Sequence, residues 1–237
     1  MRVEIWSDIA CPWCYVGKAR FEKALDAFPH RDDIEVVHRS FELDPTAAKG
    51  ETQPVIQLLT KKYGMSAAQA QAGEENLGAQ AAAEGLAYRT RDRDNGNTFD
   101  MHRLLHFAKG QDRQDELIAL LYKANFAEER SVFNDDERLV ELAVAAGLDA
   151  DETRKVLADP AAYADEVRAD EREAKELGAN GVPFFVLDRK YGVSGAQPAE
   201  VFAQALEQAW GSHSPLKLIQ ENDADACGPD GCAVPQQ

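Results

Sequence analysis

A Cys-Pro-Trp-Cys motif at residues 11–14 directly follows a short run of β-forming residues. That run, residues 3–6, predicts a buried or half-buried strand. After the motif, apolar residues recur at helical spacing through residues 16–28, and Pro29 ends the pattern. The two cysteines therefore lie where a strand gives way to a helix. This placement restricts both the fold and the chemistry, because the first sulfur falls at the start of the helix and the second falls one turn later.

The position of Cys11 predicts a reactive thiol. Unpaired backbone N–H groups and the helix dipole stabilise a thiolate at a helix N-terminus. Such placement lowers a cysteine pKa from about 8.5 to roughly 3.5–7.5. Pro12 suits the first turn, because its missing N–H would have no partner there. Cys14 lies on the same side of the helix, so we expect Cys11 to attack a disulfide and Cys14 to resolve the mixed disulfide.

The chain has two further cysteines, Cys227 and Cys232, which flank a Gly-Pro-Asp-Gly turn in an acidic tail of small residues. A structural zinc site needs four ligands, and the two pairs differ in spacing and lie at opposite ends of the chain, so we predict no metal. The turn can bring the sulfurs of the tail pair together. We interpret Cys227 and Cys232 as a secondary redox pair that exchanges with Cys11 and Cys14. A passive disulfide and a metal-scavenging pair are the alternatives.

The order of the predicted elements indicates an α/β protein with an insertion. Residues 34–37 predict a second strand, and helical patterns dominate residues 46–170. Residues 182–187 and 191–193 predict a hairpin around a polar turn, and residues 198–210 predict a last helix. The order is thus β-α-β, a helical block and β-β-α. We expect a discontinuous sheet domain (1–45 and 171–213), an all-helical insertion domain (46–170) and a mobile tail that contains cysteines (214–237).

Composition excludes several classes of function. The chain has 42 acidic and 26 basic residues and a formal net charge of −16. Binding to nucleic acid or to an anionic membrane requires clustered Lys and Arg, so neither partner is expected. No segment approaches the roughly 18 apolar residues of a membrane span. The N-terminus has neither the apolar region nor the cleavage site of a secretory signal, so we expect a cytoplasmic protein.

Four segments carry a resemblance to a known family. They are Ser-Asp-Ile-Ala-Cys-Pro-Trp-Cys at 7–14, Ser-Phe-Glu-Leu at 40–43, Asn-Thr-Phe-Asp-Met-His-Arg-Leu at 97–104 and Gly-Ala-Asn-Gly-Val-Pro-Phe-Phe at 178–185. Together with the predicted order of elements, they resemble the thioredoxin superfamily of DsbA type, and more closely its FrnE subgroup of cytoplasmic disulfide oxidoreductases. The resemblance extends over residues 1–213 and implies a thioredoxin fold.

The resemblance also implies roles for particular residues. Cys11 would be the nucleophile, Cys14 the resolving thiol and Pro183 a cis-proline that faces them. A cis bond before Pro183 would turn the backbone of Val182 toward the sulfurs, where an extended substrate can pair with it. The implied substrates are protein thiols and disulfides, with glutathione or a thioredoxin-type protein as a further partner. No organic cofactor is expected, because the cysteines hold both electrons.

Three more side chains are candidates for contact with the substrate. Pro12 and Trp13 lie between the cysteines, and Trp13 is expected to be exposed. His102 belongs to the 97–104 segment, and the resemblance suggests that its helix faces the cleft; a surface or capping role is the alternative. His106 lies one turn after His102, but the two have no third ligand nearby, so this pair does not indicate a metal site. Asp8 is expected either near the Cys11 sulfur or in a solvent-facing loop.

Two other functions stay open. One is a glutathione-dependent isomerase or transferase, as in the related 2-hydroxychromene-2-carboxylate isomerases and kappa glutathione transferases. That branch commonly has serine at the position of Cys11 and lacks the second thiol, so the presence of both cysteines argues against it. The other is a redox-sensing or chaperone-like binding module without turnover.

Overall fold

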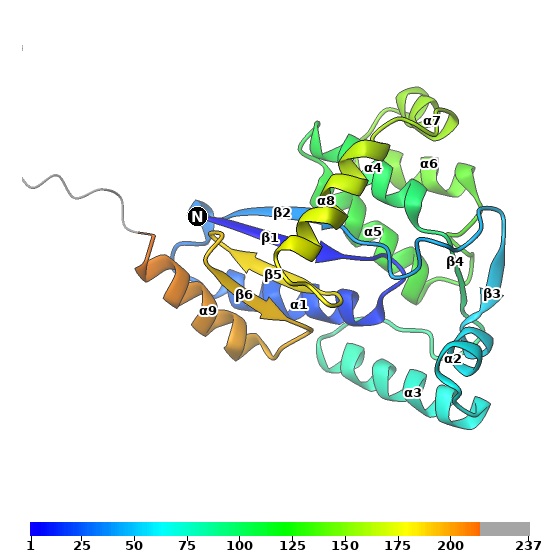
Figure 1. Ribbon diagram of the computed structural model, residues 1–237, viewed down its shortest axis with the longest axis horizontal. Helices are drawn as coiled ribbons and strands as arrows, with labels where there is room; N and C mark the ends of the chain where they lie inside the picture. The colour runs from blue at the N-terminus through cyan, green and yellow to red at the C-terminus, as the bar shows by residue number, and fades with distance from the viewer. Residues whose placement is uncertain (214–237) are drawn as a thin grey trace, which may run out of the picture.

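The computed structural model describes residues 1–213 and has a four-stranded mixed sheet at its centre (Figure 1). The strand order is β2-β1-β5-β6. The first two strands are parallel, and the other two pairings are antiparallel. The sheet thus joins the two ends of the described chain, as the order of the predicted elements indicated. Its strands are β1 (Arg2–Ser7), β2 (Glu35–Ser40), β5 (Phe184–Leu187) and β6 (Tyr191–Ser194).

One face of the sheet packs against the helix that carries the cysteines. Alternate residues of a strand point to opposite faces, so Val3 and Ile5 of β1 lie on the same side as Phe185, the partner of Ile5. These three side chains are buried in one apolar cluster with Phe21 and Phe202. The helices that cover this face are α1 (Pro12–Asp26) and α9 (Ala199–Gly211).

The other face of the sheet packs against α8 (Ala164–Glu176). Trp6 and Val186 are buried there, and the indole Nε1 of Trp6 donates a hydrogen bond to the main-chain oxygen of Asp170 at 2.8 Å. Residue 170, where we expected the insertion to end, lies inside α8. The helix therefore runs unbroken across that expected boundary.

The helices between β2 and α8 form a second body beside the sheet (Figure 1). Four of them share an apolar core that extends to the two cysteines. The other two, α2 and α3, pack on each other, and α3 also contacts α1. The six helices are α2 (Val55–Tyr63), α3 (Ala67–Ala83), α4 (Phe99–Lys109), α5 (Gln114–Ala127), α6 (Asp136–Ala145) and α7 (Ala150–Ala158).

Residue periodicity predicted an all-helical insertion, but the structure also has two short strands there. Strand β3 (Thr52–Pro54) precedes α2, and strand β4 (Asp94–Gly96) follows α3. The two strands pair antiparallel. Strands of three residues are too short to show an alternating pattern, which explains why the sequence did not predict them. Their pairing closes the α2–α3 segment into a loop that starts and ends at the same place.

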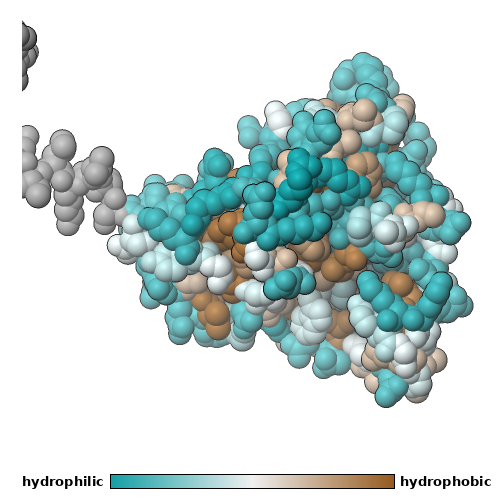
Figure 2. Space-filling view, viewed as in Figure 1, coloured by the Kyte–Doolittle hydropathy of each residue, from teal (hydrophilic) through white to brown (hydrophobic). Residues whose placement is uncertain are grey.

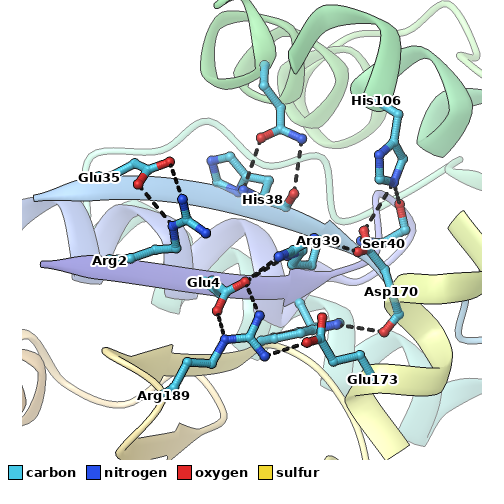
Figure 3. A network of polar contacts seen from close by, with 12 residues as sticks. Arg2, Glu4, Glu35, His38, Arg39, Ser40, His106, Asp170, Glu173 and Arg189 are labelled. Carbon is cyan, nitrogen blue, oxygen red and sulfur yellow. Dashed lines mark hydrogen bonds and ion pairs between the residues drawn. The ribbon is translucent and has the colours of Figure 1, made fainter. Parts of the chain in front are cut away.

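A network of buried charges joins the sheet to the helices (Figure 3). Glu4 of β1 is almost fully buried and accepts hydrogen bonds from Arg39, at 2.9 Å, and from Arg189, at 2.6 Å. Arg39 also pairs with Asp170 of α8 at 3.0 Å, and Asp170 pairs with His106 of α4 at 3.1 Å. Polar and charged side chains from the sheet, α4 and α8 are therefore partners for one another where these elements meet.

No helix within residues 1–213 combines the length and the apolar character needed to cross a bilayer.

Candidate active site

Cys11 occupies the N-cap of α1, at the end of the loop that leaves β1. Its carbonyl oxygen accepts hydrogen bonds from the amides of Cys14, at 3.0 Å, and Tyr15, at 3.4 Å. Pro12 follows in the first turn, as expected. The side chain of Asn125 in α5 donates a hydrogen bond to the carbonyl of Ile9 at 2.8 Å and so holds the loop that leads into α1. The first sulfur is therefore held at the positive end of the α1 dipole.

Cys14 lies deeper than Cys11. The exposed fractions are 1% for Cys14 and 5% for Cys11, and both cysteines are free thiols. Burial raises the pKa of the Cys14 thiol well above its usual range, and the hydrogen bond and charge of Cys11 raise it further. Cys14 therefore stays protonated until a mixed disulfide forms on Cys11. This difference in environment fits an attacking role for Cys11 and a resolving role for Cys14.

We expect the two single variants to differ in their thiol titrations. The protein with Cys14→Ser keeps the thiol at the helix N-terminus, whereas the protein with Cys11→Ser keeps the buried one. Thiolate absorbance at 240 nm should therefore rise at a lower pH, by at least about one unit, in Cys14→Ser. Cys227→Ser/Cys232→Ser serves as the shared background, so that only one thiol titrates in each protein. Coinciding titration curves would contradict the assignment of roles.

The loop before β5 faces the first cysteine. The peptide bond between Val182 and Pro183 is cis, and the Cys11 sulfur lies 3.6 Å from the carbonyl oxygen of Val182. Gly17 of α1 allows this close approach: a Cβ at Gly17 would lie 3.0 Å from Pro183 and 3.3 Å from Ala196. A role for Gly17 could not be predicted from the sequence, because only the packing of α1 on the loop requires a missing side chain there.

Asp8 lies in the loop between β1 and Cys11 and is buried, contrary to the solvent-facing alternative. Its carboxylate accepts hydrogen bonds from the amide of Leu43 at 2.7 Å and from that of Ala10 at 3.3 Å, and it contacts His102 Nε2 at 3.3 Å. Burial raises the pKa of the Asp8 carboxyl, but the bond and charge of His102 and the Leu43 amide outweigh burial and hold that pKa below its usual value. Asp8 thus stays ionised and holds the loop that presents Cys11.

His102 does not reach the surface of the site. Its side chain is 1% exposed and lies against Asp8. We therefore do not retain it as a substrate contact: α4 turns this side chain inward, to a buried carboxylate. The periodicity of the helix could not reveal this, because the partner belongs to a distant loop. His106 likewise pairs with Asp170 and not with His102.

A pocket of about 500 Å³ opens beside the cysteines. It is lined by Cys11, Trp13 and Val182 and by side chains of α2 and α3, including Leu58 and Leu77. Figure 2 shows hydrophobic residues across the middle of the face that it draws, and a few more where α2 lies. The sequence did not predict this pocket, because its walls come from segments that meet only in the folded chain.

The remaining site residues of the sequence prediction fall in three places. Pro12 and Trp13 line the pocket, and Trp13 is 39% exposed, as expected for a residue between the cysteines. Pro183 is buried beneath Val182. Cys227 and Cys232 lie outside the described residues. Within residues 1–213, no group of three or more His, Cys, Asp or Glu side chains is arranged to hold a metal ion.

The fold and these cysteines define a class of protein. A family model described as DSBA-like thioredoxin domain matches residues 2–207, so the chain belongs to this family. Its fold is therefore the thioredoxin-like fold of DsbA proteins, with helices inserted, as the sequence indicated.

Three known proteins are similar to the chain over most of its length. A crystal structure of a probable DsbA oxidoreductase from Streptomyces coelicolor is 79% identical, covers 100% of both chains and has a TM-score of 0.90. The uncharacterised protein YwbO of Bacillus subtilis is 28% identical over 87% of this chain and 96% of its own length. The cytosolic disulfide reductase DsbM from Pseudomonas aeruginosa is 18% identical over 90% of this chain and 100% of its own, with a TM-score of 0.62, and it shares the fold.

Proposed function

We propose that this protein is a cytoplasmic thiol–disulfide oxidoreductase of the FrnE type that exchanges disulfides with protein substrates through Cys11 and Cys14. The single observation that carries the proposal is the contrast between two neighbouring thiols. Cys11 is at a helix N-terminus beside a pocket, and Cys14 is buried with a raised pKa. Two inert core cysteines would not need this asymmetry.

The exchange follows from the positions of the sulfurs. The Cys11 thiolate attacks one sulfur of a substrate disulfide, so that a Cys11–substrate bond forms and the other substrate sulfur leaves as a thiolate. Cys14 then loses its proton and attacks Cys11. The substrate sulfur that was bound to Cys11 leaves as a thiolate, and the enzyme holds a Cys11–Cys14 disulfide. The reverse sequence oxidises a substrate dithiol, and the reduction potential of the pair decides which direction prevails.

The loop at Val182 supplies the place for the substrate chain. The Cys11 sulfur lies against the Val182 carbonyl, and Pro183 holds this backbone next to the sulfurs. An extended substrate can pair with exposed backbone of this kind as an added strand. Pro12 and Trp13 would contact the substrate from the other side of Cys11.

The test is a set of three assays on the purified protein. We expect reduction of insulin in the presence of dithiothreitol, and recovery of activity from scrambled ribonuclease if the protein also isomerises. Equilibration with glutathione buffers gives the reduction potential of Cys11 and Cys14 and hence the direction of electron flow. A protein that forms the Cys11–Cys14 disulfide but catalyses neither reaction would instead be a redox-sensing or binding module.

The reductant is proposed to be glutathione or a thioredoxin-type protein. DsbM, which shares this fold, has also been crystallised with glutathione. Either reductant needs to reach only the Cys11 sulfur, the more accessible of the two, because reduction proceeds by attack of a thiolate on one sulfur of the disulfide.

A further inference from the structure

The pocket beside Cys11 has apolar walls that are incompletely covered. Four apolar side chains of the lining are only half-buried, although they lie in a folded hairpin of helices: Leu58 and Leu59 of α2, Met65 of the α2–α3 turn and Leu77 of α3. Such side chains gain by burial against an apolar group that enters the pocket. A volume of about 500 Å³ lies within the range of about 300–1,000 Å³ seen for ligand pockets.

The two buried charged groups of the lining neutralise each other. Arg93 and Glu74 pair at 2.7 Å, with side chains that are 5% and 4% exposed. Arg93 also donates to the hydroxyl of Tyr88 at 2.9 Å and stacks over its ring. The two other charged residues of the lining, Asp44 and Lys62, have opposite signs. A ligand with several carboxylates, such as glutathione, finds no unpaired cation among the buried residues of this lining.

The rim of the pocket extends its apolar surface. Trp13, Leu43 and Tyr63 line the pocket and are 39%, 40% and 62% exposed. They are half of the six large hydrophobic side chains that are exposed in residues 1–213. A small molecule inside the pocket would leave these rim residues in water, whereas a polypeptide that continues past the mouth would cover them. The rim therefore favours a polypeptide as the occupant.

We propose that this pocket binds a large aliphatic or aromatic side chain that lies close in sequence to the reacting cysteine of a substrate polypeptide. The α2–α3 hairpin would thus give the enzyme a preference among cysteines, and Cys11 would perform the exchange. This inference rests on the proposed function and adds the substrate class to it.

The test compares peptides on the wild-type protein and on two variants. Each peptide has one cysteine, which forms a disulfide with a small thiol. The residue before and the residue after this cysteine are both Phe in one set of peptides and both Ser in the other. We expect kcat/KM for the Phe peptides to exceed that for the Ser peptides by about tenfold or more, since a buried aromatic side chain contributes at least that factor. Dithiothreitol, which is too small to use the pocket, reports the reactivity of the Cys11–Cys14 pair alone.

Gly73→Leu is the decisive variant. Gly73 lines the pocket from α3, and a Cβ there would meet no atom within 4 Å, so a leucine fits and fills the space. Leucine also favours a helix more than glycine does, so the fold is retained. The variant should reduce the preference for Phe to about twofold or less through KM, with the dithiothreitol reaction unchanged. Ala72→Leu, on an exposed position of the same helix and outside the lining, should leave the preference intact.

Equal kcat/KM for Phe and Ser peptides would overturn the inference, and so would a preference that survives Gly73→Leu. A small aromatic disulfide or glutathione disulfide that reacts faster than the Phe peptides, and that Gly73→Leu slows, would show a small-molecule site instead. These failures leave exchange with dithiothreitol in place. The absence of any exchange, even with dithiothreitol, would instead refute the proposed function together with this inference.

Discussion

Cys11→Ser lowers the rate of disulfide exchange with a protein substrate by at least about a thousandfold, because it removes the only sulfur held at the start of α1 and open to the pocket. Cys14→Ser should instead stop after the first step and accumulate a mixed disulfide. Its Cys11 can still attack, but the buried thiol that releases the substrate is missing. Non-reducing electrophoresis and mass spectrometry of the adduct measure both outcomes.

The adduct experiment needs two controls. The variants are made with Cys227 and Cys232 replaced by serine, so that the tail cannot form or resolve an adduct. The double variant Cys11→Ser/Cys14→Ser then sets the background. Equal trapping by both single variants would mean that the two sulfurs share the attacking role. Comparison with the proteins that keep Cys227 and Cys232 tests whether the tail pair relays electrons, as the sequence suggested.

Asp170→Asn should lower the free energy of unfolding at neutral pH by about 3–5 kcal/mol, the usual cost of removing one partner from a buried ion pair. The Asp170 side chain is 4% exposed, pairs with Arg39 at 3.0 Å and His106 at 3.1 Å, and accepts from the Ser40 amide at 2.9 Å (Figure 3). Asparagine keeps the shape and loses the charge, so Arg39 loses its counterion and His106 loses its carboxylate partner. Urea unfolding measures the difference.

The same variant predicts a dependence on pH. Burial raises the pKa of Asp170, but the bond to His106, the Ser40 amide and the charge of Arg39 outweigh burial and hold that pKa below its usual value. A carboxyl with a lowered pKa stabilises the folded state above its unfolded pKa, near 3.9, and that contribution is lost as the pH falls through the folded pKa. The gap between wild type and variant should therefore be full at neutral pH and shrink below about pH 4.

A matched control separates this effect from a general loss of charge. Glu176→Gln lies on the same helix at an exposed position, and it should change the free energy of unfolding by no more than about 0.5 kcal/mol. A gap between wild type and Asp170→Asn that stays constant down to pH 3 would contradict the account of the buried network.

Local sequence patterns determined the elements that place the cysteines. Alternating and helical apolar spacings predicted β1, α1, the β5–β6 hairpin and α9 to within a few residues, because backbone geometry and burial of one face fix those periods. The Cys-Pro-Trp-Cys motif between a strand and a helix indicated the reactive thiol, and the fold class followed from the order of elements. These patterns depend only on residues close to one another in the sequence, so they can be recognised without knowledge of the rest of the chain.

Tertiary structure alone decided what surrounds the thiols. The family resemblance suggested that His102 faces the cleft, with a surface or capping role as the alternative, yet its side chain is turned inward against a carboxylate of a distant loop, Asp8. The pocket, the Arg93–Glu74 pair in its lining and the need for glycine at position 17 arise from contacts between α1, the α2–α3 hairpin and the loop at Val182. The free energy of such contacts depends on which segments meet and on which apolar and polar groups are then buried or paired. The spacing of residues along the sequence does not encode which distant segments meet.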